Sequence, residues 1–76
     1  MSVRGGMLLH QSVHSSNLRS VGYDELECVL EVAFHGGRLY RYDKVPAQVH
    51  AALMAAPSKG TFLAQFIKGR YPYRRV

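Results

Sequence analysis

Residues 27–35 constrain the fold more than any other segment, because apolar and other side chains alternate along them. Four apolar side chains recur at every second position: Cys28, Leu30, Val32 and Phe34. A period of two is that of a β-strand with one buried face. Gly36-Gly37 follows, and glycine adopts the positive φ angles of a tight turn without steric cost. We therefore expect a β-hairpin in which residues 39–45 form the return strand.

The length of the turn decides which face the tyrosines of the return strand occupy. A two-residue turn would set Arg41 on the apolar face. A three-residue loop, residues 36–38, pairs Val32 with Tyr42. It turns the rings of Tyr40 and Tyr42 toward the apolar face and leaves Arg41 outside. A one-residue slip exchanges the two faces, so burial selects the register and favours the longer loop.

The rest of the chain divides into shorter elements. Residues 18–23 alternate as a first strand, and residues 46–55 carry apolar side chains at helical spacing. Ser58 is a suitable N-cap for a second helix, and Gly69 is a suitable residue to end it. The tail that follows, residues 70–75, is expected to be extended because Pro72 disfavours helix before it.

These elements predict an α+β fold in the order β-β-β-α-α. A small three-stranded antiparallel sheet would carry two helices on one face, followed by the extended C-terminal tail. The chain has 76 residues, which suits one domain. Residues 1–14 are rich in Gly, Ser and His and are expected to form a flexible arm. Residues 15–76 would form the single domain.

Charge is distributed unevenly along the chain. Lys and Arg total 10 against 5 Asp and Glu, and every acid lies between Asp24 and Asp43. No acidic residue follows Asp43, whereas six basic residues do: Lys44, Lys59, Lys68, Arg70, Arg74 and Arg75. A stretch of one sign attracts polyanions such as nucleic acid. The alternative is a solvated basic surface that serves solubility.

Aromatic and basic side chains also alternate, in Tyr40-Arg41-Tyr42 and across residues 70–75. Proteins that bind single-stranded nucleic acid stack bases on aromatic rings and contact phosphates with cations. The alternative is that tyrosines fill a small core with their hydroxyls in water. The favoured register supports the core interpretation for Tyr40 and Tyr42 and leaves both open for Tyr71 and Tyr73.

Residues 58–61 are a possible anion site. Ser58, Lys59, Gly60 and Thr61 would offer hydroxyls, a lysine and free backbone amides at the start of a helix. The preceding glycines of a Walker loop are missing. The simpler alternative is an N-cap followed by a solvated lysine.

Catalysis has weak support. Cys28 should be a buried structural residue on the apolar face of its strand. Ser16, with His14 and Asp24, contains the residue types of a hydrolase triad, but no nucleophile elbow is present. His10 and His14 are four residues apart without further ligands nearby, so we predict no metal site. A hydrolase using Ser16 or Cys28 is therefore the least favoured function.

Cellular context follows from what the sequence lacks. Cys28 is the single cysteine, so no intrachain disulfide can form. No apolar run approaches the roughly 20 residues that span a bilayer, and the N-terminus has no secretory signal. We expect a cytoplasmic protein without membrane contact and without a cofactor.

Several short motifs occur in a recognisable order: Ser15-Ser16-Asn17, Val21-Gly22-Tyr23-Asp24, Tyr40-Arg41-Tyr42, Val45-Pro46, Ser58-Lys59-Gly60 and Ile67-Lys68-Gly69-Arg70-Tyr71-Pro72. From about residue 15 to residue 76 the chain resembles the KTSC domain, found alone in bacteria and phages and appended to some lysyl-tRNA synthetases. One departure is Gly36-Gly37, where Asn-Gly is common.

The resemblance implies no known activity and no catalytic residue. It implies a link to RNA, which has been suggested for the family partly through the tRNA synthetases. Tyr40 and Tyr42 match the family's Tyr-x-Tyr motif, and Ser58-Lys59-Gly60 matches its Ser-Lys-Gly.

The sequence therefore favours a non-catalytic module that binds RNA or another nucleic acid. Five cations would contact phosphates: Lys59, Lys68, Arg70, Arg74 and Arg75. Arg41 and Tyr71 would add stacking or further phosphate contacts. The alternative is a protein–protein interaction module that uses a sheet edge or the hairpin.

Overall fold

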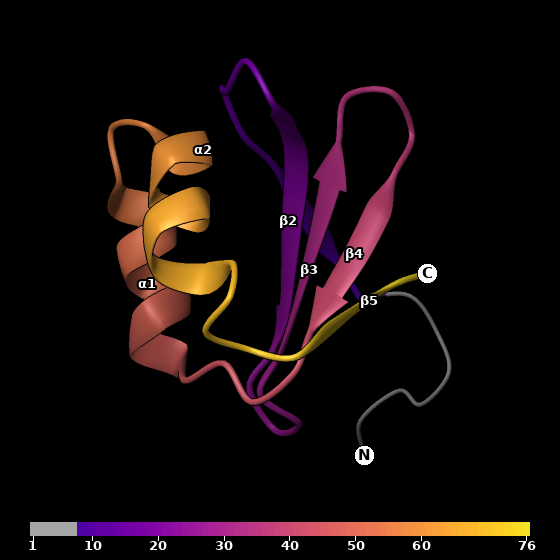
Figure 1. Ribbon diagram of the computed structural model, residues 1–76, viewed down its shortest axis with the longest axis vertical. Coiled ribbons are helices and arrows are strands. Elements are labelled where there is room, and N and C mark those ends of the chain that lie inside the picture. The colour runs from indigo at the N-terminus through magenta and orange to yellow at the C-terminus, as the bar shows by residue number, and fades with distance from the viewer. Residues whose placement is uncertain (1–7) are drawn as a thin grey trace.

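One antiparallel sheet and a helical layer make up residues 8–76, the part of the chain that the computed structural model describes. The strands follow one another in sequence order across the sheet (Figure 1). They are β1 (His10–Ser12), β2 (Leu18–Asp24), β3 (Val29–Phe34), β4 (Leu39–Tyr42) and β5 (Tyr73–Arg75). The helical elements are α1 (Ala47–Ala55), α2 (Lys59–Phe62) and the π-helical turn η1 (Leu63–Ile67). No helix among the described residues is long and apolar enough to span a membrane.

The prediction of a three-stranded sheet is wrong, because the sheet has five strands. β1 pairs with β2 at one edge, and β5 pairs with β4 at the other. The sequence predicts a flexible arm that includes residues 10–12 and an extended tail that includes residues 73–75. Neither segment has the alternation of apolar and polar side chains that marks a half-buried strand, since an edge strand is held through backbone hydrogen bonds that carry no side-chain pattern. Residues 1–7 of the expected arm lie outside the described residues.

The β3–β4 hairpin has its tyrosines on the predicted face but in a different register. Val32 pairs with Tyr40 rather than with Tyr42. The loop comprises residues 35–37, closed by hydrogen bonds from the Phe34 amide to the Arg38 carbonyl at 2.8 Å and from the Gly37 amide to Phe34 at 3.1 Å. The shift amounts to two residues, which preserves the face of every side chain.

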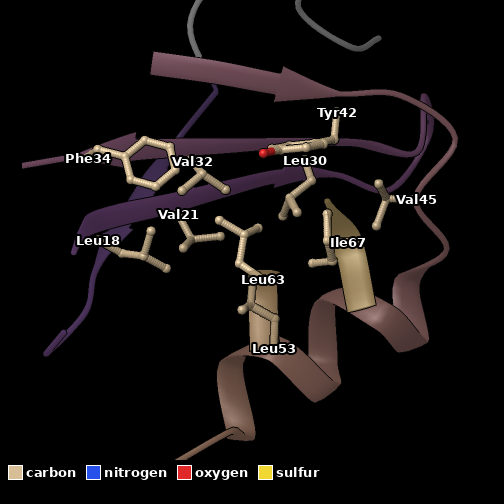
Figure 2. Close-up of a cluster of buried hydrophobic side chains, with 10 residues drawn as sticks. All are labelled: Leu18, Val21, Leu30, Val32, Phe34, Tyr42, Val45, Leu53, Leu63 and Ile67. Atoms are coloured by element: carbon tan, nitrogen blue, oxygen red, sulfur yellow. The ribbon is translucent and has the colours of Figure 1, made fainter. Parts of the chain in front are cut away.

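The core lies between the sheet and the helices (Figure 2). The sheet contributes Leu18, Val21, Leu30, Val32, Phe34 and Tyr42. A β-bulge between Leu18 and Ser20 lets Leu18 and Val21 share the buried face although they are three residues apart. The predicted alternation of residues 18–23 therefore fails at that point.

The helices cover one face of the sheet, as predicted (Figure 1). Leu53 of α1 and Leu63 and Ile67 of η1 are buried in the core. Ser58 caps α2, because its hydroxyl accepts a hydrogen bond from the Thr61 amide. Gly69, with φ of 80°, follows the last turn and permits the chain to leave the helix.

The position predicted for Cys28 is wrong. β3 begins at Val29, and Cys28 lies half-buried in the preceding turn with φ of 57°. The side chain of Asp24 accepts hydrogen bonds from the amides of Leu26 and Glu27. These bonds form a local turn that delays the strand. The alternation predicted to include Cys28 therefore starts one pair later, at Leu30.

Candidate nucleic-acid interface

The C-terminal residues are fixed in place along the outer edge of the sheet. Tyr40 pairs with Arg75, and Tyr42 pairs with Tyr73. Two further backbone hydrogen bonds of 2.8 Å, from Asp43 to the Pro72 carbonyl and from Val76 to the Leu39 carbonyl, extend this ladder at both ends. The tail is therefore an ordered strand whose side chains alternate between the two faces of the sheet.

Four of the predicted phosphate contacts are exposed along this C-terminal segment: Lys68, Arg70, Arg74 and Arg75. Among the described residues no acidic side chain pairs with any of them; the two ion pairs found there both involve Glu31. These four cations fall within eight consecutive residues, which would span about 28 Å if fully extended. The segment therefore presents four positive charges without an acidic partner among the described residues, with Arg74 and Arg75 on opposite faces of the sheet.

Arg41 does not belong to this group. Its guanidinium binds the carboxylate of Glu31, with Nε 2.9 Å from Oε2 and Nη2 also in contact. Glu31 is 1% exposed, and a buried carboxylate is costly unless it is paired. Arg41 is therefore committed to neutralising Glu31, and we remove it from the predicted phosphate contacts.

Glu31 is the centre of a polar row on the face opposite the helices. Its Oε1 lies 2.8 Å from Nε2 of His10, whose Nδ1 lies 2.7 Å from the hydroxyl of Ser20. The sequence did not indicate this row, since it joins residues of β1, β2, β3 and β4. The one available signal was a glutamate within the otherwise apolar run of β3.

Aromatic rings form a second row, on the face that carries the core. The ring centroids of Tyr40 and Tyr73 are 5.6 Å apart, and those of Tyr42 and Tyr73 are 5.5 Å apart. Tyr42 is fully buried, so the core interpretation is confirmed for it. Burial, followed by the neighbouring phenols of Tyr73 and Tyr40, raises the pKa of Tyr42. Tyr40 is half-buried against the core, and Tyr73 is 58% exposed.

Tyr71 and Arg70 line a hollow in the helical layer. The hollow has a volume of about 330 Å³, and its other walls are Gln48, Val49, Ala52, Phe62 and Phe66. Tyr71 is partly buried against the core. Its ring therefore helps to connect the helices to β5. Only part of the ring surface is accessible to a ligand.

The Ser-Lys-Gly motif lies elsewhere. The Ser58 hydroxyl donates to Oγ1 of Thr61 at 2.9 Å, and Nζ of Lys59 donates to the Ala56 carbonyl at 3.0 Å. Gly60 allows close approach, because a Cβ there would lie 3.1 Å from Nδ2 of Asn17. The Ser-Lys-Gly motif and the Ser15-Ser16-Asn17 motif thus border one polar hollow, which is lined by His14, Ser15, Ser16, Asn17 and residues 57–61.

Lys59 lies on a different element from the C-terminal cations, at the start of α2. It lies nine residues before Lys68 along the helical segment, which corresponds to about 14 Å at 1.5 Å per residue. Anion binding by residues 58–61 stays a prediction that is separate from the C-terminal group.

The residues considered for catalysis are not brought together. Ser16 is exposed in the loop before β2, and Cys28 lies in the turn before β3, where its thiol faces the Glu25 carbonyl at 3.8 Å. His10 contacts Ser20 and Glu31 rather than His14. Across residues 8–76 no three His, Cys, Asp or Glu side chains are grouped as metal ligands.

Comparisons with known proteins agree on one family. The family model of the KTSC domain matches residues 14–71. A protein of Stutzerimonas stutzeri, named only as uncharacterized, is 46% identical over 66 residues, covering 86% of this chain and 93% of that protein. A lysine–tRNA ligase of Trichormus variabilis is 36% identical over 61 residues, which are 80% of this chain but 11% of the ligase.

A solved structure shares the fold. The crystal structure of a KTSC domain protein from Yersinia pestis superposes with a TM-score of 0.86 at 38% sequence identity. The alignment covers 92% of this chain and 99% of that one. The five-stranded arrangement with its helical layer is thus common to both molecules.

Proposed function

This chain belongs to the KTSC domain family, and from that premise we propose that it is a cytoplasmic binding module for RNA. One observation carries the proposal. Lys68, Arg70, Arg74 and Arg75 are exposed together on an ordered segment without an acidic partner among the described residues. Unpaired cations gathered in this way attract the phosphates of nucleic acid.

The relatives support RNA as the nucleic acid. Lysine–tRNA ligases of Trichormus variabilis and Nostoc punctiforme contain a segment 36% and 34% identical to this chain. Their name states that they act on tRNA. The segment is 11% of each ligase, so the likeness concerns a small part rather than the whole enzyme. An RNA-binding role would suit such a part.

We propose binding rather than catalysis. His10 is hydrogen-bonded to both Ser20 and Glu31, and these three residues are of the types found in a hydrolase triad. Glu31 is already neutralised by Arg41, which weakens its ability to stabilise a protonated histidine. Ser20 also pairs with Ala33 inside the sheet, unlike a nucleophile held on an exposed turn. A structural role in burying Glu31 accounts for the same contacts.

Protein interaction through a sheet edge has less support. The two edge strands, β1 and β5, are three residues long, and β5 carries two arginines. Short, charged edges resist pairing with another strand.

Titration of a labelled RNA at several salt concentrations tests the proposal. Four phosphate contacts on a single strand predict that the logarithm of the binding constant falls with the logarithm of salt at a slope of about −3. Replacing Arg70, Arg74 and Arg75 together by Glu should abolish binding at about 50 mM salt.

Arg19→Glu is the control, and it is compared also with Arg74→Glu alone, which changes the net charge by the same amount. Arg19 is an exposed cation on β2, away from the C-terminal segment. It should leave the affinity close to that of the wild type. Absence of binding at low salt, or equal losses in the control and the triple variant, would refute the proposed surface.

A further inference from the structure

The aromatic row on β3, β4 and β5 extends from the buried core to the exposed edge of the sheet. Phe34 meets Tyr40 edge-on at 5.5 Å between ring centroids, and Tyr73 follows at 5.6 Å. Exposure increases along the row from Phe34, which is 9% exposed, to Tyr73, which is 58% exposed. The end of the row at the sheet edge therefore presents aromatic surface to solvent.

The position of Tyr73 follows from the register of β5. Tyr73 pairs directly with Tyr42 and lies diagonally across from Tyr40, so its ring touches both. Tyr42 beneath it is fully buried. The Tyr73 ring thus contacts Tyr40 and Tyr42, while the residue as a whole is 58% exposed, which suits a planar ligand.

Positive charge borders this surface. Arg75 pairs with Tyr40, so both side chains lie on the same face of the sheet. Arg38, exposed at the end of the hairpin, has its guanidinium carbon 5.9 Å from the centroid of the Phe34 ring. No acidic side chain among the described residues forms an ion pair with either arginine. The chemistry is that of stacked rings flanked by cations.

We propose that Tyr73, supported by Tyr40 and with Arg75 beside it, is a base-stacking surface that makes the module selective for single-stranded RNA, while Arg38 adds positive charge at the Phe34 end of the aromatic row. This inference rests on the proposed RNA binding and specifies its form. Aromatic side chains stack on unpaired bases, whereas the bases inside a duplex already have both faces covered. A duplex could reach only the surrounding cations.

The test compares one RNA strand of about 8 nucleotides, within the span that small single-strand binders cover, with the duplex of that strand and its complement. Fluorescence anisotropy at about 50 mM salt measures both affinities, a condition at which phosphate contacts are strong. The wild type should bind the single strand more tightly. Tyr73→Leu keeps an apolar side chain but removes the ring. It should weaken single-strand binding by about 5- to 150-fold, the range that one stacked base spans.

Two variants control for the fold and for exposed apolar surface in general. Tyr73→Phe keeps the ring and should bind like the wild type. Leu26→Ala removes another exposed apolar side chain, 76% accessible, from the turn before β3 and should also bind like the wild type. Circular dichroism must show that each variant melts near the wild-type temperature.

The outcomes separate the two proposals. Equal affinity for strand and duplex, or no loss in Tyr73→Leu, overturns the stacking surface while RNA binding stands. No binding of either RNA by the wild type overturns both. Selective loss of single-strand affinity in Tyr73→Leu, with duplex binding unchanged, supports the stacking surface.

Discussion

Gly22 shows how much one residue without a side chain can determine. It lies on β2 between His10 of β1 and Glu31 of β3, and it pairs with both. The imidazole of His10 crosses above Gly22 to reach the Glu31 carboxylate at 2.8 Å. A Cβ at this position would lie 2.7 Å from Cδ2 of His10, closer than unbonded carbon atoms approach. The glycine therefore leaves the space that the hydrogen bond requires.

Gly22→Ala should accordingly destabilise the protein. The added methyl group displaces His10 from Glu31, which removes a hydrogen bond to a buried carboxylate worth about 1.5–3 kcal/mol. Urea denaturation should show a loss of about that size in the free energy of unfolding. In a His10→Ala background the same substitution should cost less, because the imidazole is absent. An equal cost in both backgrounds would show that His10 is not the group displaced.

At the level of elements, three local features define the second helical segment, which comprises α2 and η1. Ser58 caps its start, the chain widens to a π-helical turn from Leu63 to Ile67, and Gly69 ends it. The wider turn is closed by a 2.8 Å hydrogen bond from the Lys68 amide to the Leu63 carbonyl. Leu63 and Ile67, which bound the turn, are both buried. The widened turn thus coincides with the contact that the segment makes with the sheet.

Ser58→Ala tests whether the Ser-Lys-Gly motif serves the helix or a ligand. Loss of the N-cap should lower the free energy of unfolding by about 1 kcal/mol, measured by urea denaturation. RNA affinity at a temperature where the variant is folded should be unchanged. Ser58→Asp, which can also accept from the Thr61 amide, is the control and should recover most of the stability. Weakened RNA binding in a folded Ser58→Ala protein would instead place the motif in the interface.

At the scale of the whole molecule, the helical layer is attached to the sheet by the core and by an aromatic stack at its margin. The rings of Tyr23 on β2 and His50 on α1 are nearly parallel, with centroids 4.5 Å apart. The Tyr23 hydroxyl donates to the Val45 carbonyl. Burial, followed by the nearby Cys28 and acidic groups, raises the pKa of Tyr23 to about 12. Burial lowers the pKa of His50, against a smaller opposing effect of Glu25.

The lowered pKa of His50 predicts that stability decreases in mild acid. Because the folded state holds His50 neutral, the unfolded state binds more protons below its ordinary pKa of about 6.5. Stability is therefore complete above about pH 6.5 and declines as the pH falls toward the folded-state pKa. Thermal melts between about pH 7.5 and 5 should show this decline. His50→Gln should reduce the slope, and an unchanged slope would exclude His50 as its source.

The β3–β4 hairpin, the two helices and the face of Tyr42 could be predicted because each depends on local signals. Alternation, a glycine pair, a prolyl boundary and a serine cap act within a few residues of chain. The start of β3 was misplaced because the side-chain hydrogen bonds of Asp24 override the alternation at Cys28. The predicted hairpin register differs from the observed one by two residues, because either alignment buries the same face and the side-chain pattern cannot distinguish them.

The candidate site was predictable only in part. The bases of the C-terminal segment are evident from composition, and four of them are exposed. Whether a base is free depends on its neighbours in space. Arg41 is committed to Glu31, and no sequence pattern indicated that the carboxylate would be buried between β2 and β4.

The amino-acid sequence alone predicts the central hairpin, the helical layer and an acid-free, basic stretch after Asp43. These follow from periodicity and charge, which are properties of neighbouring residues. Long-range pairing, by contrast, brings residues 10–12 and 73–75 into the sheet as β1 and β5. That pairing uses backbone hydrogen bonds common to every residue, so no side-chain pattern announces it. It is also what places Tyr73 against Tyr40 and turns a tail of alternating rings and cations into an ordered surface.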